Sequence, residues 1–148
     1  MRKYHWRMYL IYILIILCYL IGSSWILGVQ KEQASKMFDP FPFMVWSTVI
    51  FIMLGILLGL EHLLLEIKKE GQWELNLPKI ILLGIPLFYL AMSYFIYYFP
   101  TSSVTVQEIL SYPIRFILCS RMSQTYMGIF QVMLGYIIIT SFYKMQDS

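Results

Sequence analysis

Long stretches without a charged side chain constrain this chain more than any other feature of its sequence. The clearest runs from Phe41 to Leu60, where twenty successive residues are uncharged. An α-helix rises about 1.5 Å per residue, so such a stretch covers about 30 Å, the thickness of the hydrocarbon core of a bilayer. An uncharged stretch of this length is typical of a transmembrane helix, and three other apolar stretches suggest the same interpretation.

Helix start and stop signals separate these stretches. Asp39 and Pro40 precede the second one, where an aspartate can cap a helix and a proline costs little. Gly71 is suited to the end of that helix and Asn76 to the start of the next, which leaves only a tight connection over residues 72–75. We predict spans at about residues 8–28, 41–66, 79–99 and 126–143.

The composition agrees with a chain that faces lipid. Hydrophobic residues make up 59% of the chain and charged residues 13%, whereas soluble domains carry about 25% charged residues. So little charge cannot solvate a whole protein surface, and lipid is the solvent that suits the excess of apolar side chains. We therefore predict an all-α integral membrane protein, a four-transmembrane-helix bundle that forms one polytopic membrane domain over residues 1–148.

The segment between the third and fourth spans has a different pattern. Thr105 to Glu108 has the form of a helix capping box, and apolar residues then recur at helical spacing. The segment is too short and too polar to cross a bilayer. We predict a short amphipathic surface helix over about residues 105–120, and a re-entrant turn is the alternative.

The positions of Lys and Arg predict the orientation. One side of the membrane would hold seven of these residues and the other side four. The seven are Arg2, Lys3, Arg7, Lys68, Lys69, Lys79 and Lys144, and the four are Lys31, Lys36, Arg115 and Arg121. Because basic residues accumulate on the cytoplasmic side, we expect a multi-pass protein of the cell membrane with both termini in the cytoplasm.

Small residues at helical spacing indicate where the spans pack. Gly55 and Gly59 form a GxxxG pattern in the second span, and Gly128 and Gly135 lie seven residues apart in the fourth. Glycines let helix backbones approach closely in a bilayer. Packing within one four-helix bundle is the favoured interpretation, and a homo-oligomer that forms through Gly55 and Gly59 is the alternative.

Three polar residues lie inside or beside the spans and are candidates for a functional polar site. Glu61 and His62 are adjacent, so they point about 100° apart on a helix. Intramembrane ionisable groups are often functional, but Leu60 already completes a span, which favours two side chains that leave the membrane. Gln131 lies inside the fourth span, where its amide requires a partner on another helix.

The chain has no motif of a catalytic, cofactor-binding or metal-binding site. Its basic residues do not form the dense face that nucleic acid requires. We expect no cofactor or metal, and the bilayer and another membrane protein, or a second copy, as partners. A non-enzymatic protein is favoured over an intramembrane enzyme that acts on lipid, because the sequence shows no polar cavity for such an enzyme. The favoured function is a non-enzymatic accessory or interaction subunit of a larger membrane assembly. The alternative is a small oligomeric transporter or channel that uses Glu61, His62 and Gln131.

Overall fold

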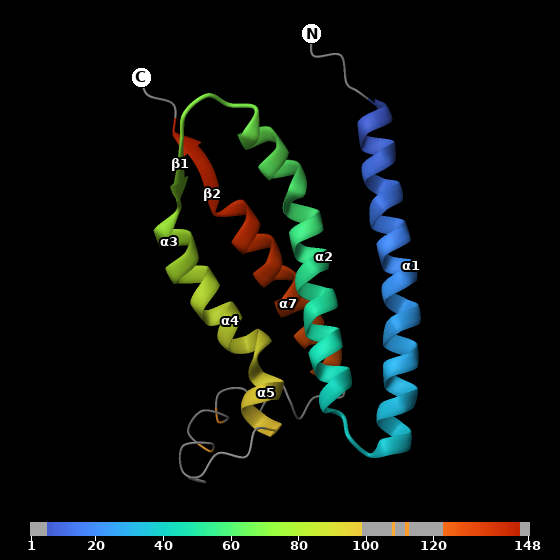
Figure 1. Cartoon of the computed structure of the whole chain (residues 1–148). Coiled ribbons are helices and arrows are strands. Elements are labelled where there is room, and N and C mark those ends of the chain that lie inside the picture. Colours follow the sequence, from blue (N-terminus) through green and yellow to red (C-terminus); the bar gives the residue numbers. More distant parts are fainter. Residues whose placement is uncertain (1–5, 99–107, 109–111, 113–122, 146–148) are drawn as a thin grey trace. The chain divides into compact units, whose positions relative to one another are not determined.

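The computed structural model describes residues 6–98, 108, 112 and 123–145, which are mostly helical, as predicted. The chain divides into two compact units, Met1–Trp46 and Ser47–Ser148. The elements are labelled in Figure 1. The helical elements are α1 (Trp6–Met37), α2 (Phe41–Ile67), α3 (Leu77–Lys79), the π-helical turn η1 (Ile80–Gly84), α4 (Ile85–Ala91), α5 (Ser93–Tyr98) and α7 (Ser123–Thr140), and the strands are β1 (Gln72–Leu75) and β2 (Phe142–Met145).

Two helices of the described chain are long and apolar enough to cross a membrane. These are the segments Tyr9–Met37 of α1 and Phe41–Ile67, which is the whole of α2. Two further apolar helices are shorter, Leu77–Ala91 and Gln124–Thr140. The four apolar helices fall where the sequence predicts spans.

Helix α1 exposes apolar side chains around most of its circumference. Successive residues of an α-helix are about 100° apart, so the position of each exposed residue gives the side of the helix on which it lies. On this basis the exposed apolar residues of α1 extend over about two thirds of a turn. They include Leu10, Ile11, Ile15, Leu20 and Ile26, which are between 36% and 59% exposed.

Helix α2 begins at the predicted cap. The Oδ1 atom of Asp39 accepts a hydrogen bond of 3.0 Å from the backbone N–H of Phe41, which satisfies one of the amides that a helix start leaves without a partner. Pro42 follows in the first turn, where its missing N–H costs little. The helix then continues without interruption to Ile67.

The third predicted span is divided into several helical pieces. Asn76 caps it, because its side chain accepts a hydrogen bond from the N–H of Lys79. Pro86 has no N–H to bond the carbonyl four residues earlier, and the preceding turn is wide, with the N–H of Ile85 bonded to the carbonyl of Ile80. A second break falls at Met92, whose φ of −91° and ψ of 5° interrupt the helix between α4 and α5.

A small two-stranded antiparallel sheet accompanies the helices. Strands β1 and β2 pair in the register Gln72↔Met145 to Leu75↔Phe142. The segment predicted as a tight connection over residues 72–75 is therefore a strand, and the fourth span ends at Thr140 instead of continuing to residue 143. The physical reason is that each strand supplies the hydrogen-bond partners of the other.

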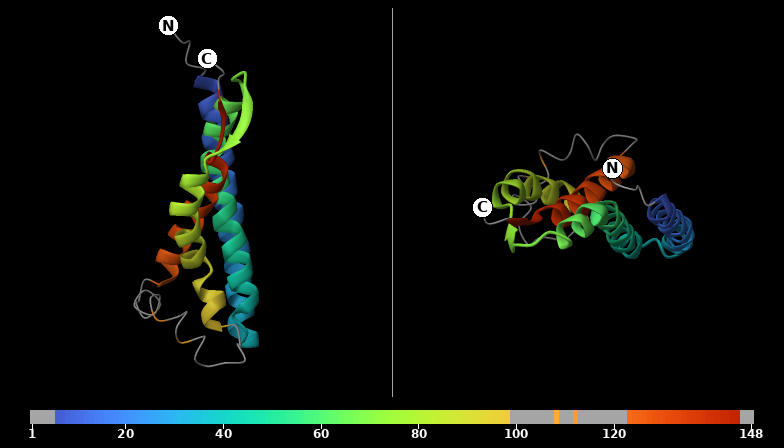
Figure 2. Two further views of the ribbon diagram at one scale, coloured as in Figure 1. Left: turned by 90° about the vertical axis from the view of Figure 1, so that its left-hand side faces the viewer. Right: turned by 90° about the horizontal axis from the view of Figure 1, so that it is seen from above.

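The core of the second unit lies between α4 and α7. It consists of the buried residues Leu87, Ala91, Leu134 and Ile137, with Ile52 of α2 and Phe130 packed against them. Figure 2 shows α4 and α7 side by side in both views. The apolar face of α7 is therefore the centre of this unit.

The predicted surface helix over about residues 105–120 lies outside the described residues, apart from Glu108 and Tyr112. Both that helix and its re-entrant alternative stay predictions. The predicted single membrane domain over residues 1–148 also stays a prediction, since the division into two compact units does not decide it.

Candidate functional site

Six residues of α2 form a regular stripe along one face of the helix. Their spacing alternates between four and three residues and averages 3.6, the period of an α-helix, which keeps them on one side of the helix. Helix α7 runs in the same direction as α2 along this stripe (Figure 1). The stripe, which we call the seam, consists of Thr48, Ile52, Gly55, Gly59, His62 and Glu66.

The middle of the seam brings the backbones of α2 and α7 into contact. A Cβ atom on Gly55 would lie 2.0 Å from the carbonyl oxygen of Val132, and one on Gly135 would lie 2.1 Å from the carbonyl oxygen of Ile52. Both distances are far below van der Waals contact, and the obstructing atoms belong to the main chain. Only glycine permits this crossing at both positions.

The other two predicted packing glycines lie in the same contact. A Cβ atom on Gly59 would lie 1.9 Å from Cγ2 of Ile139, and one on Gly128 would lie 3.3 Å from the ring of Phe51. All four glycines therefore lie between α2 and α7 of one chain. The homo-oligomer through Gly55 and Gly59 stays a prediction.

The first polar point of the seam is Thr48, which contacts Gln131 of α7. Gln131 is 2% exposed. Its Nε2 donates hydrogen bonds of 2.9 Å to Oγ1 of Thr48 and 3.3 Å to the carbonyl oxygen of Ala91. The amide thus connects α7 to both α2 and α4. A buried amide is costly without partners, and here it holds three helices together.

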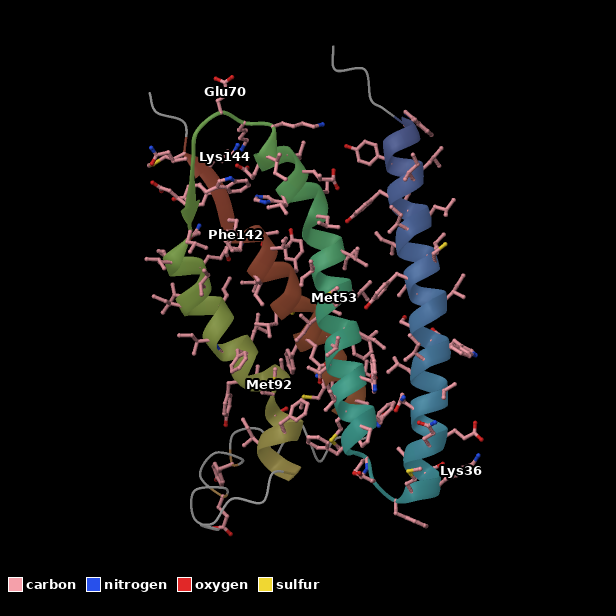
Figure 3. All side chains as sticks on the ribbon, viewed as in Figure 1. Lys36, Met53, Glu70, Met92, Phe142 and Lys144 are labelled. Atoms are coloured by element: carbon pink, nitrogen blue, oxygen red, sulfur yellow. The ribbon has the colours of Figure 1, made fainter. Side chains whose placement is uncertain are left out.

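A buried serine and methionine lie beside the break at Met92, which is labelled in Figure 3. The hydroxyl of Ser93 lies 2.7 Å from the carbonyl oxygen of Leu90 and 2.8 Å from Sδ of Met127. Ser93 is fully buried and Met127 is 1% exposed. The hydroxyl therefore serves the helix break and the packing of α7.

The second polar point is Glu66, at the other end of the seam. Its carboxylate accepts hydrogen bonds from the ammonium group of Lys69 and, at 3.1 Å, from the backbone N–H of Lys144. Glu66 is only 6% exposed, and a buried carboxylate requires such partners. The sequence interpretation passed over Glu66 as a site, although continuing the glycine spacing through His62 would have reached it.

Two lysines donate hydrogen bonds to carbonyl oxygens at the C-terminal ends of α2 and α7. The Nζ atom of Lys144, labelled in Figure 3, donates to the carbonyl oxygens of Ile67 at 3.1 Å and Lys69 at 2.7 Å. The Nζ atom of Lys79 donates to the carbonyl oxygen of Thr140 at 3.0 Å and to its hydroxyl at 2.8 Å. Cations at these ends satisfy unpaired carbonyls and oppose the negative end of the helix dipole.

The structure does not bring Glu61, His62 and Gln131 together. Glu61 lies off the seam and is exposed, whereas His62 lies on the seam and is half-buried. Gln131 contacts Thr48, and His62 follows Thr48 by fourteen residues, a rise of about 21 Å along α2. The three candidate residues therefore belong to two separate places.

His62 is the one histidine whose surroundings the structure describes. Its Nδ1 atom is buried and has no hydrogen-bond partner among the described residues. Glu66 follows one turn later on the same face. In the described part of the chain no group of three or more His, Cys, Asp or Glu side chains could hold a metal ion, and the expectation of no metal or cofactor stays a prediction.

Comparisons with known proteins assign no family to the chain. The sequence matches no protein-family model, and searches among curated proteins and solved structures gave no match.

Proposed function

We propose that the protein is a four-span protein of the cell membrane, with both termini in the cytoplasm, and that it acts as a non-enzymatic accessory or interaction subunit of a larger membrane assembly. The observation that carries the proposal is the surface of α1. This helix is long enough to cross a bilayer, and it exposes apolar side chains over most of its circumference. Such a helix suits lipid and the helices of a partner.

The end of α7 supports a membrane boundary at the level of the β1–β2 sheet. Helix α7 stops at Thr140, where the polar contacts of Lys79 and Asn76 begin. On α2 the matching level is Gly59, which faces Thr140 across the seam. Glu61 and Glu66 then lie beyond the apolar part, at the depth of the headgroups, as expected for a helix that leaves the bilayer.

The buried polar groups favour an accessory role over a transport path. Gln131 uses its amide to join three helices, and Ser93 serves the break between α4 and α5. A transport path requires polar groups that follow one another across the membrane. Here about 21 Å of seam separates Gln131 from His62 and contains two glycines, Gly55 and Gly59, in contact with α7.

Purification from the native membrane in a mild detergent tests the proposal. We expect the protein to elute with another multi-pass protein, at a mass well above that of its own micelle. A Gly22→Leu variant sharpens the test, because no atom lies within 4 Å of the position that a Cβ would take there. We expect this variant to fold normally and to recover several-fold less of the partner.

One control variant and one contradicting result complete this purification test. Leu14→Ala, at an exposed apolar position of the same helix, removes surface without adding bulk and should change partner recovery less than Gly22→Leu does. A homogeneous monomer, purified without any partner in several mild detergents, would contradict the accessory role.

A small oligomeric transporter or channel is the second candidate. The buried Nδ1 atom of His62, which has no hydrogen-bond partner among the described residues, favours it. Proton uptake into proteoliposomes tests this function, with His62→Ala and Glu61→Gln as separate variants. Uptake that depends on His62 would support transport, whereas uptake that survives both substitutions would remove these residues from any pathway.

A further inference from the structure

The pairing of β1 with β2 determines which main-chain groups of each strand are free. The N–H of Asn76 donates a hydrogen bond of 2.9 Å to the carbonyl of Ser141, directly beyond the pair Leu75↔Phe142. Inward-pointing and outward-pointing residues alternate along an antiparallel strand. The N–H and C=O groups of Trp73 and Leu75 therefore point away from β2.

Strand β2 shows the same alternation independently. Lys144 pairs with Trp73, so its N–H should also point away from the ladder, and it does so by donating to Oε2 of Glu66. The outer edge of β2 is thus engaged by α2. Trp73 and Leu75 have no corresponding hydrogen bond among the described residues, and Figure 1 shows β1 on the side of β2 that faces away from α2.

The side chains along this free edge differ between the two faces of the β1–β2 sheet. Trp73 and Leu75 share one face and are each 48% exposed. Glu74 lies on the opposite face, and Glu70, labelled in Figure 3, is exposed just before the strand. On the first face the Nζ atom of Lys144 also lies 5.2 Å from the centre of the Trp73 ring. This face is therefore apolar with one cation beside the Trp73 ring, and the other face is acidic.

We propose that β1 is the docking edge for an extended segment of a partner protein, which adds to the sheet as a third strand. The segment alternates apolar residues, which cover Trp73 and Leu75, with basic residues, which face Glu74 and Glu70. Main-chain hydrogen bonds from Trp73 and Leu75 give the affinity, and the alternating side chains give the specificity. The inference rests on the proposed interaction function and names the partner's chemistry.

A second copy of the chain is a poor occupant of this edge. The register that pairs both outward residues of one β1 with those of another places Glu74 opposite the same residue of the second copy. Like charges directly opposite each other destabilise a ladder. The neighbouring register would pair Leu75 with Gly71, whose φ of 138° is not that of a strand.

A lipid surface is also a poor occupant, because the positive and negative charges at the end of the unit that holds the β1–β2 sheet are equal in number. In the part that the structure describes, this end carries four lysines and four glutamates, so it does not attract anionic headgroups. The lysines are Lys68, Lys69, Lys79 and Lys144, and the glutamates are Glu61, Glu66, Glu70 and Glu74.

A synthetic peptide tests the docking edge on the full chain in detergent micelles. The probe is a seven-residue peptide that alternates lysine and valine, and the measurement is the amide hydrogen-exchange rate of Trp73 and Leu75. We expect saturating peptide to slow exchange at these two amides at least tenfold and to leave that of Glu74, which already bonds β2, nearly unchanged. Unchanged exchange at Trp73 and Leu75 would overturn the proposal.

Two control peptides distinguish strand addition from binding through charge or apolar contact alone. A lysine–valine peptide with N-methyl groups on the amides that would face β1 should bind at least tenfold more weakly. A glutamate–valine peptide should also bind weakly, because it faces Glu70 and Glu74. Equal binding of all three peptides would mean that no strand is added. Tighter binding of the β1–β2 sheet to vesicles of anionic lipid than to the peptide would assign the edge to the membrane.

Two variants of the protein complete the test. Glu70→Lys should lower the affinity for the lysine–valine peptide several-fold, whereas Lys68→Glu should not lower it. If the peptide fails to bind but a partner still co-purifies with the intact protein, the docking edge is wrong and the proposed function stands. If the peptide binds and no partner co-purifies from the native membrane, the accessory role fails on its own test.

Discussion

Helices α1 and α2 are both long and apolar, yet their glycines have opposite surroundings. Around Gly22 and Gly28 of α1 no atom lies within 4 Å of the position of an added Cβ. On α2 an added Cβ would overlap the main chain of α7 at Gly55 and a side chain of α7 at Gly59. The same residue type therefore has no close neighbour in one helix and is a requirement of packing in the other.

The difference comes from the residues that accompany the glycines. On α2 they belong to the seam, which starts with Thr48 and ends with Glu66, and both ends form hydrogen bonds to other elements. A polar group at each end fixes how α7 and β2 lie along α2. The glycines between them then allow the close approach that the polar contacts require.

Substitutions of the glycines should give the largest difference between the two helices. Gly55→Ala or Gly135→Ala places a methyl group against main-chain atoms, so α2 and α7 must separate. We expect a loss of about 3 kcal/mol in the free energy of unfolding, the upper end of the usual cost of overpacking. Unfolding in mixed micelles with increasing SDS measures it.

Gly22→Ala in α1 is the matched control for these glycines. It meets no atom, and alanine favours a helix over glycine by up to about 1 kcal/mol. We expect this variant to be as stable as the parent or slightly more stable. Equal losses in α1 and α2 would break the comparison.

The two glutamates at the end of α2 should differ almost as strongly. Glu66→Ala leaves the N–H of Lys144 without its acceptor, and losing a bond to a buried charged group costs about 2 kcal/mol. We expect the amide of Lys144 to exchange faster by a corresponding factor, as measured by NMR. Glu66→Gln should restore part of the protection, since its carbonyl oxygen can still accept this bond.

Glu61→Ala provides the control for Glu66. Glu61 is exposed and lies outside the seam, and surface substitutions of this kind change stability by less than about 0.5 kcal/mol. A larger loss of stability at Glu61 than at Glu66 would show that the seam does not continue to the β1–β2 sheet.

The amide of Gln131 should make a moderate contribution. Gln131→Leu removes its bonds to Thr48 and Ala91, and hydrogen bonds between membrane helices are worth about 0.6–1.7 kcal/mol. A double-mutant cycle with Thr48→Val measures the part that the two side chains share. Gln124→Leu, at an exposed position of the same helix, should cost little, and zero coupling in the cycle would contradict the bond.

The smallest expected effect is a pH dependence of the stability of the β1–β2 sheet. The Glu74 carboxylate accepts a hydrogen bond of 3.0 Å from the Tyr143 hydroxyl, and this bond, with burial and the negative charge, raises the pKa of Tyr143 above its ordinary value. The folded state thus favours the protonated phenol. Its stabilisation is complete below the ordinary pKa of about 10 and is lost as the pH rises through the higher pKa of the folded state.

Amide exchange in β1, corrected for the intrinsic effect of pH, measures this loss. We expect constant protection up to about pH 9 and a decline above about pH 10. The Tyr143→Phe variant lacks the bond and should show no such decline. The same decline in both proteins would assign the effect to another group.

From the sequence alone, the helical class, the four apolar helices and the caps at Asp39 and Asn76 could be predicted, because each depends on neighbouring residues. The sequence also marks four glycines as candidates for packing, and in the structure they lie between α2 and α7. The free β1 edge could not, since Gln72–Leu75 and Phe142–Met145 are short and lie far apart along the chain. Nothing within either segment indicates its partner.

Tertiary structure decided which polar residues matter. Glu61, His62 and Gln131 are candidates because they interrupt apolar sequence. This pattern does not indicate the direction in which a side chain points. The fold leaves Glu61 exposed, buries Glu66 five residues later, and gives Gln131 a structural role. The physical reason is that composition determines whether a helix suits a bilayer, whereas only the neighbouring helix determines which of its faces is buried.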